Sequence, residues 1–346
     1  MTELRGGDRP TTKDFEKGYD DVKLLAKNVT TVIRGKDEKV ELVLAAVLAN
    51  GHVLLEDMPG TGKTFLARAI AASIAVPFER AQFTPDVYPS DITGHMRWDY
   101  EQKRQVLEEG PLIIGRDTGM IFLADEINRA SPKTQSALLE AMGERQVTID
   151  RTYKLASPFT VLATQNPIDQ EGTYPLPEPQ LDRFLIREKL GYTTPEQAVE
   201  ILRARRHGHP IDDVEKVLTG DDVRRLQKLV QHVIIHPELE IWIAMIVERT
   251  RELAAERDTV VLGASHRGIE ALDIMARAGA LFHERDFVIP EDIEALIVPT
   301  LGHRVLFTGA LEAEIESDGE EALKDFFQEN VLGPVKRPNV KSYRSA

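Results

Sequence analysis

Short apolar runs alternate along the first half of the chain with stretches in which apolar residues recur at helical spacing. The run Met120-Ile121-Phe122-Leu123-Ala124 is typical of a strand buried on both faces of a sheet. We expect five strands, over residues 53–55, 78–83, 120–124, 159–163 and 184–186. Helices are predicted before the first strand, over residues 40–48, and between later strands, over residues 65–74 and 132–142. Strands that alternate with helices imply an α/β fold with a parallel sheet covered by helices.

Two segments interrupt this alternation. Residues 84–112 are punctuated by Pro85, Pro89 and Gly94, and 96–98 can pair with 105–107 as a hairpin. Residues 147–155 alternate like a second, shorter hairpin. A stretch as long as the first one, between strands of a compact domain, is usually functional or mobile.

The pattern changes near Gly191, after which only helical periodicity remains. Thr194 and Gln197 have the spacing of a capping box. Further helices are predicted around residues 223–233 and over 238–256, 265–281 and 290–297. We therefore expect four regions: an N-terminal tail and leading helix (1–28), an α/β domain (29–190), an all-helical domain (191–332) and a loose basic tail (333–346).

Composition narrows the class of protein. The 346 residues carry a net charge of −14, which argues against binding nucleic acid or an anionic membrane through the overall field. The sequence has no cysteine, so disulfides and thiolate chemistry are excluded. No run approaches the ~18 apolar residues of a membrane span, and the polar N-terminus lacks the apolar segment of a signal peptide. We expect a cytoplasmic protein.

The segment HVLLEDMPGTGKT, residues 52–64, has the order strand, tight loop, helix that a phosphate-binding loop requires. Backbone N–H groups and the helix N-terminus would bind phosphate, Lys63 would reach the β- and γ-phosphates of ATP, and the Thr64 hydroxyl would hold Mg²⁺. Asp57 replaces the first glycine of the usual pattern, and we expect it to tolerate a left-handed backbone. The residues predicted to bind the nucleotide here are Pro59, Gly60, Thr61, Gly62, Lys63, Thr64 and Phe65.

Asp125 and Glu126 directly follow a buried strand, at the edge where open α/β sheets bind ligands. Two adjacent carboxylates there can divide the work. We predict that Asp125 binds Mg²⁺ together with Thr64, and that Glu126 acts on an attacking water.

Three further polar residues are candidates for catalysis. Asn166 ends another core strand, and its amide can polarise the water or the γ-phosphate. Arg183 can act as an arginine finger on a neighbour's phosphate, although an exposed ion pair with Asp182 is the alternative. If Ser265 caps its helix, Arg267 lies in the first turn, where the dipole disfavours a cation and a phosphate would relieve the conflict.

This order of parts resembles the AAA+ ATPases, and within them the MoxR family. EDMPGTGKT is similar to that family's Walker A, FLADEINRA to its Walker B, ATQNP to sensor 1, QLDRF to the arginine-finger segment and GASHRG to sensor 2, usually GASPR. His266 replaces that proline, which bears on where the helix starts. The segments 84–112 and 147–155 resemble the helix-2 insert and the pre-sensor-1 hairpin.

The resemblance implies a phosphate-loop AAA+ core followed by a helical lid. It further implies ATP and Mg²⁺ as cofactors, with Val32 and Gly35 bordering the adenine. The implied assembly is a ring, often hexameric, and the implied role is chaperone-like remodelling of a client. Such clients commonly carry a von Willebrand factor A domain, often in metal insertion or enzyme activation.

Other functions share these parts. A magnesium-chelatase-type motor subunit would have similar inserts. A nucleic-acid motor could use the inserts to grip DNA, but the acidic balance opposes it and the 147–155 hairpin offers only Arg151 and Lys154. A nucleotide-dependent scaffold without turnover is hard to reconcile with a complete hydrolytic set of residues. The sequence does not identify the client.

Overall fold

The structure is a computed structural model that describes residues 9–58, 60–166, 173–206, 210–256, 258–340 and 342–343. The chain divides into two compact units. The core unit is Leu25–Arg224, and the helical unit is Arg225–Ala346 together with Met1–Leu24. Both limits fall inside helices, α1 (Thr12–Thr30) and α8 (Gly220–Gln231). The domain limits predicted at 28/29, 190/191 and 332/333 differ from these and stay predictions.

The core unit is built on a five-stranded parallel sheet with the strand order β2-β5-β8-β1-β9. The predicted α/β fold is therefore confirmed. The strands are β1 (Val53–Glu56), β2 (Phe78–Gln82), β5 (Met120–Asp125), β8 (Phe159–Gln165) and β9 (Ile186–Glu188). The last strand begins later than predicted, because the Phe184 N–H bonds to the Leu181 carbonyl in a turn.

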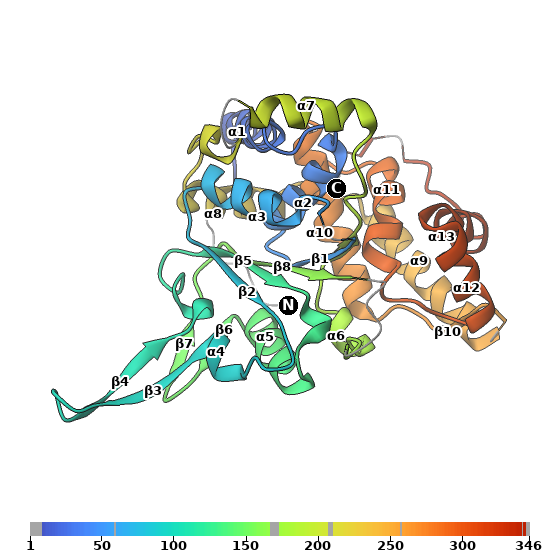
Figure 1. Ribbon diagram of the computed structural model, residues 1–346. Coiled ribbons are helices and arrows are strands. Elements are labelled where there is room, and N and C mark those ends of the chain that lie inside the picture. Colours follow the sequence, from blue (N-terminus) through green and yellow to red (C-terminus); the bar gives the residue numbers. More distant parts are fainter. Residues whose placement is uncertain are drawn as a thin grey trace. The chain divides into compact units, whose positions relative to one another are not determined.

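Helices lie on both faces of this sheet, and Figure 1 shows α3 (Lys63–Ser73) on one side and α5 (Pro132–Glu144) on the other. Alternate strand residues such as Phe122, Ala124 and Val161 belong to the apolar cluster that includes α5. Their neighbours Ile121 and Leu123 are equally buried. Burial on both faces is the reason that the central strands are continuous apolar runs.

Besides the parts of α1 and α8 that belong to it, the described residues of the core unit form further helices. They are α2 (Asp37–Leu48), α4 (Pro89–Thr93), α6 (Glu178–Leu181) and α7 (Pro195–Arg205), with short helices η1 (Pro111–Ile113), η2 (Ile127–Arg129) and η3 (Pro210–Asp213). The capping box predicted for α7 is confirmed, since the Thr194 N–H donates to Gln197 Oε1 at 2.9 Å and the Gln197 N–H to Thr194 Oγ1 at 3.3 Å.

Both predicted hairpins are present. β3 (Gly94–Asp99) pairs antiparallel with β4 (Arg104–Glu109), and β6 (Gln146–Thr148) with β7 (Thr152–Lys154). The first hairpin extends away from the sheet in Figure 1 and carries the exposed aromatic residues Trp98 and Tyr100.

The helical unit contains part of α1 and of α8 and, in full, α9 (Pro237–Glu256), α10 (His266–Phe282), α11 (Pro290–Leu301), α12 (Gly309–Asp318), α13 (Glu320–Phe326) and η4 (Phe327–Leu332). A helical second domain is thus confirmed. The structure adds a short antiparallel ribbon of β10 (Val260–Leu262) and β11 (Leu306–Phe307), which we did not predict. None of the described helices is long and apolar enough to cross a membrane.

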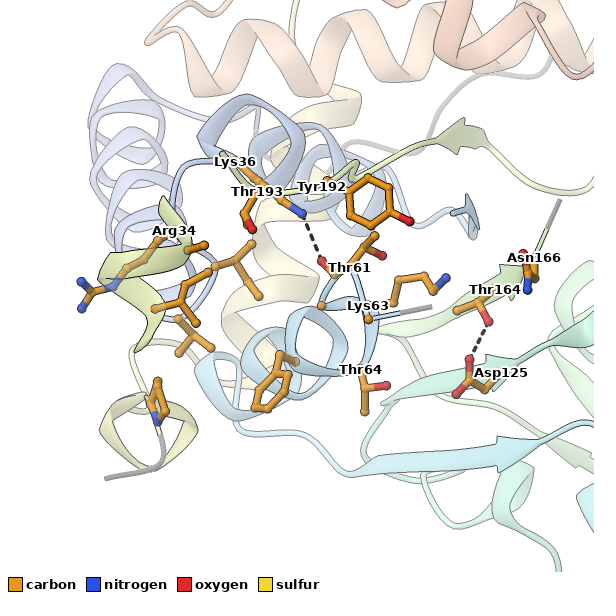
Figure 2. Close-up of a pocket in the computed structure, with 18 of the residues that line it drawn as sticks. Arg34, Lys36, Thr61, Lys63, Thr64, Asp125, Thr164, Asn166, Tyr192 and Thr193 are labelled. Atoms are coloured by element: carbon orange, nitrogen blue, oxygen red, sulfur yellow. Dashed lines mark hydrogen bonds between the residues drawn. The ribbon is translucent and has the colours of Figure 1, made fainter. Parts of the chain in front are cut away.

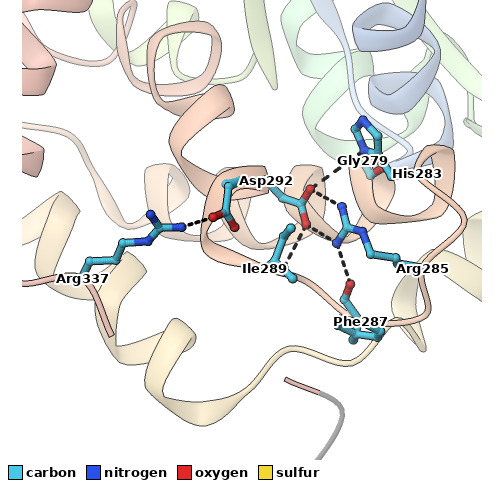
Figure 3. Close-up of polar contacts among 8 residues, drawn as sticks. Gly279, His283, Arg285, Phe287, Ile289, Asp292 and Arg337 are labelled. Atoms are coloured by element: carbon cyan, nitrogen blue, oxygen red, sulfur yellow. Dashed lines mark hydrogen bonds and ion pairs between the residues drawn. The ribbon is translucent and has the colours of Figure 1, made fainter. Parts of the chain in front are cut away.

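The segment after η4 is not the loose tail that we expected, at least over residues 333–340. Val335 is buried, and Arg337 donates to Glu291 at the start of α11 (Figure 3). The same helix start is fixed by Asp292, whose carboxylate accepts two hydrogen bonds from Arg285, at 2.5 and 2.6 Å. Apolar burial and charge pairing therefore hold this segment against α11.

Candidate functional site

The phosphate-loop segment joins the end of β1 to the start of α3. Gly60 and Gly62 have φ angles of 85° and 99°, a region that residues with a side chain rarely adopt. Gly62 is the N-cap of α3, so the helix begins at Lys63. The first-turn N–H groups lack partners within the helix, and this helix end carries partial positive charge. Pro59, assigned to the same loop, lies outside the described residues.

Asp57 stands where the loop pattern usually has its first glycine. We expected Asp57 to tolerate a left-handed backbone there, but the loop does not require one, since Asp57 is not among the described residues with a positive φ. Its carboxylate is used instead. Oδ1 accepts the Met58 N–H at 3.0 Å, and Oδ2 accepts the Gly191 N–H at 2.9 Å. A glycine could make neither bond, so the side chain of Asp57 closes the loop.

Lys63 lies among the loop carbonyls and faces acidic residues. Its Nζ donates to the carbonyls of Asp57 at 2.6 Å and Met58 at 3.1 Å. Burial lowers the pKa of Lys63, and the charges of Asp57, Asp125 and Glu126 oppose that shift. These acids favour the charged ammonium that phosphate binding needs.

Asp125 and Glu126 end β5 and are held by a set of hydrogen bonds. The Thr164 hydroxyl donates to Asp125 Oδ1 at 2.6 Å and accepts the Glu126 N–H at 2.8 Å (Figure 2 shows the first bond). Arg80 Nη2 donates to Asp125 Oδ2 at 2.7 Å, and Arg129 Nη1 to Glu126 Oε2 at 3.0 Å. Glu126 has a φ of 57°, and such strained residues cluster at functional sites.

A pocket of about 760 Å³ in the core unit brings most of the predicted site together. Predicted residues that line it are Val32, Gly60, Thr61, Gly62, Lys63, Thr64, Phe65, Asp125, Glu126 and Asn166. Figure 2 shows Lys63 and Thr64 at the start of α3, with Asp125 and Asn166 at the strand ends. The apolar part of the lining, here called the apolar end of the pocket, consists of Val32, Ile33, Ala198, Ile201 and Leu202, and Arg34 also lines the pocket.

Three predicted residues do not line this pocket. Gly35 lies between the lining residues Arg34 and Lys36. It has a φ of 70°, and its carbonyl accepts a hydrogen bond from Gln197 Nε2 at 3.1 Å. Arg183 is half-buried, and its Nη1 donates to the Leu139 carbonyl in α5. Arg267 belongs to the helical unit and is exposed. The roles proposed for these residues stay predictions.

The helix that carries Arg267 starts as the sequence predicted. Ser265 is its N-cap, with a side chain that accepts the Arg267 N–H at 3.1 Å, and the first helical residue is His266. The helix therefore begins directly after Ser265, as predicted, with histidine in place of the usual proline.

Sequence reasoning missed several residues of the pocket, among them Lys36, Arg80, Thr164 and Tyr192. Arg80 meets Asp125 only because β2 pairs with β5, and the strand order is not readable from the sequence. Thr164 lies near the end of β8, two residues before Asn166, which directly follows the strand, so their closeness in sequence was an available signal.

The arrangement suits a nucleoside triphosphate with Mg²⁺. A glycine loop at a helix N-terminus and a lysine bind phosphate, while a hydroxyl and a carboxylate are oxygen ligands that Mg²⁺ accepts beside phosphate oxygens. The apolar end can take the plane of a base. The fold and the site together define the chain as an AAA+ ATPase.

Comparisons with known proteins agree with this class. A family model described as the ATPase family associated with various cellular activities matches residues 52–186, and an AAA lid domain model matches 252–325. The solved structure of a proposed ATPase from Cytophaga hutchinsonii superposes with a TM-score of 0.81 at 35% identity, covering 92% of this chain and 96% of that one.

Relatives define the family more closely. YeaC of Bacillus subtilis is 46% identical over 91% of this chain and 95% of its own length. Chaperone MoxR1 of Mycobacterium tuberculosis is 40% identical over 84% of this chain and 77% of its own length. The chain belongs to the MoxR family of AAA+ ATPases.

Proposed function

We propose that this protein hydrolyses ATP with Mg²⁺ in the pocket of the core unit and uses the energy to remodel a partner protein. One observation carries the hydrolytic part: Lys63 and Thr64 share a pocket with Asp125, Glu126 and Asn166. Phosphate-binding groups and water-activating groups are thereby within one cavity, as phosphoryl transfer to water requires.

Each residue has a distinct task in this proposal. Lys63 binds the β- and γ-phosphates, and Thr64 with Asp125 would hold Mg²⁺, which neutralises phosphate charge when bound. Glu126 accepts the proton of the attacking water while Arg129 fixes its carboxylate, 3.0 Å away. Asn166 orients that water from the end of β8.

The division of tasks is testable with two variants. Lys63→Ala should abolish binding of a fluorescent ATP analogue, because it removes the ammonium that contacts the phosphates. Glu126→Gln should bind the analogue normally and lose about 10²–10⁴ in hydrolysis rate, the typical contribution of a general base. Glu140→Gln, an exposed position on α5, is the matched control and should retain wild-type rates. Equal rates in Glu126→Gln and wild type would remove Glu126 from the mechanism.

The remodelling part rests on the family. The name of the Mycobacterium tuberculosis relative calls that protein a chaperone, and we extend this role to the present chain. We further propose a ring of identical subunits, often six in such ATPases, in which Arg183 acts on the ATP of the neighbour and Arg267 on that of its own subunit. A client with a von Willebrand factor A domain, in metal insertion or enzyme maturation, is the partner we favour.

Assembly and client binding need separate tests. Light scattering with and without ATP should reveal an ATP-favoured ring, and a monomer at all concentrations would contradict the assembly. Affinity capture with Glu126→Gln, which would hold ATP without turnover, should enrich the client relative to Lys63→Ala. Equal capture by the two variants would argue against an ATP-dependent remodeller.

A further inference from the structure

Gly191, three residues beyond β9, is held by two side chains of opposite charge. Its N–H donates to Asp57 Oδ2 at 2.9 Å, and its carbonyl accepts a hydrogen bond from Lys36 Nζ at 2.6 Å. Both side chains belong to buried residues, with 7% of Asp57 and 8% of Lys36 exposed. One backbone unit is therefore fixed on both of its polar groups.

The same two side chains also hold the phosphate loop. Lys36 Nζ donates to the Thr61 carbonyl at 3.0 Å, as Figure 2 shows, and Asp57 is itself a loop residue. Lys36 comes from outside the loop, as the N-cap residue of α2. Lys36 and Asp57 thus join the loop to Gly191, and we call this set of contacts the latch.

Buried charges are costly, so the latch needs a reason other than stability. Burial lowers the pKa of Lys36, and the charge of Asp57 opposes the shift. Replacing buried charged residues with apolar ones is often neutral or stabilising, whereas a defined geometry is one use for which such residues are retained. Here the geometry that the two side chains define is the position of Gly191 relative to the loop.

The position of Gly191 determines where α7 begins, because only three residues separate it from Pro195 at the start of that helix. α7 contributes Ala198, Ile201 and Leu202 to the apolar end of the pocket. Gln197 adds a second tether from α7, to the Gly35 carbonyl. The latch therefore connects the phosphate end of the pocket to one wall of its apolar end.

We propose that Lys36 is a positioning residue for the nucleotide base: it fixes α7 against the phosphate loop, so that the apolar wall lies at the right distance from bound phosphates. This inference rests on the proposed nucleotide binding and adds a residue that sets base affinity through the position of α7. The phosphate loop keeps its own supports in the absence of Lys36, since Thr61 Oγ1 donates to the Met58 carbonyl and the Asp57 N–H to the Gln165 carbonyl.

The test compares two ligands that differ by adenosine. Isothermal titration calorimetry would measure the Kd of ADP and of pyrophosphate, each with Mg²⁺, for wild type and for Lys36→Met. Lys36→Met removes the charge-assisted hydrogen bond to the Gly191 carbonyl. The affinity for ADP should therefore fall about tenfold, and the affinity for pyrophosphate should stay within about twofold of wild type. The ratio of the pyrophosphate Kd to the ADP Kd should therefore fall about tenfold.

Two controls separate this role from general damage. Lys39→Met removes another α2 lysine, which pairs with Glu188 and does not line the pocket, and should keep the wild-type ratio. Lys36→Arg keeps the positive charge and the hydrogen-bond donors, so its ratio of the two Kd values should be close to that of wild type. If Lys36→Met does not fold, Lys36→Gln, which keeps a polar side chain but is shorter and lacks the ammonium, should lower the ratio in its place.

Three results would overturn the inference. Equal loss of ADP and pyrophosphate affinity in Lys36→Met would mean that Lys36 only shapes the loop. An unchanged ratio with unchanged affinities would mean that the latch does not position α7. Wild-type protein that binds neither ligand would refute the proposed function itself and the inference with it.

Discussion

His52, directly before β1, should make the core unit lose stability in mild acid. Its side chain is almost fully buried, Nδ1 accepts the Val161 N–H at 3.0 Å, and Nε2 lies 3.2 Å from the Met142 carbonyl. Because Nδ1 accepts, Nε2 must carry the proton, and the ring is neutral. Burial, with the nearby Arg145 charge, lowers the pKa of His52 to about 3.

The magnitude follows from proton linkage. The unfolded chain has an ordinary histidine with a pKa of about 6.5, so between pH 6.5 and 3 the unfolded state binds more protons than the folded state. Stability is therefore fully present above pH 6.5 and falls as the pH drops below it. Between pH 7 and pH 5 the loss from this one group is about 2 kcal/mol.

Urea unfolding followed by circular dichroism, at pH 7 and pH 5, measures this loss. His52→Gln should be less stable than wild type at pH 7, because the ring packing is lost. Its further loss between pH 7 and pH 5 should be about 2 kcal/mol smaller than that of wild type. His232→Gln, at an exposed position, should behave as wild type. Parallel losses in His52→Gln and wild type would refute a neutral, buried His52.

Four other outcomes follow from the site. Arg183→Ala should bind ATP but hydrolyse it about 10³–10⁵-fold more slowly, and mixing it with Lys63→Ala should restore part of the phosphate release; no recovery in demonstrably mixed rings would exclude action in trans. DNA should neither bind tightly at physiological salt nor stimulate turnover, and salt-sensitive binding tighter than micromolar would favour the nucleic-acid motor. Arg80→Ala should lower the Mg²⁺ concentration for half-maximal hydrolysis about two- to fivefold, because Asp125 loses a competing cation; an unchanged Mg²⁺ titration would contradict this. Gly35→Ala should cost about 1–2 kcal/mol through its left-handed φ, and an unchanged urea midpoint would show that the position relaxes.

Some of the physical signals that define this fold are local in the sequence. The central strands β1, β5 and β8 were predictable because a strand buried on both faces is apolar along most of its length, whereas β2 is only partly buried. The start of α10 was predictable from Ser265 alone, because an N-cap serine satisfies a first-turn N–H through its own side chain. α12 and α13 were not predicted, and α12 has no strong apolar stripe to signal it.

The sequence by itself determined the phosphate loop, the paired carboxylates and the alternation of strands and helices, since each depends on residues within a few positions of one another. Only the tertiary structure decided which distant residues meet. Strand order brings Arg80 to Asp125, and the return of the chain after β9 brings Gly191 to Asp57 and Lys36. These contacts depend on the register of parallel strands and on where loops cross the sheet edge, and neither leaves a periodic trace in the sequence.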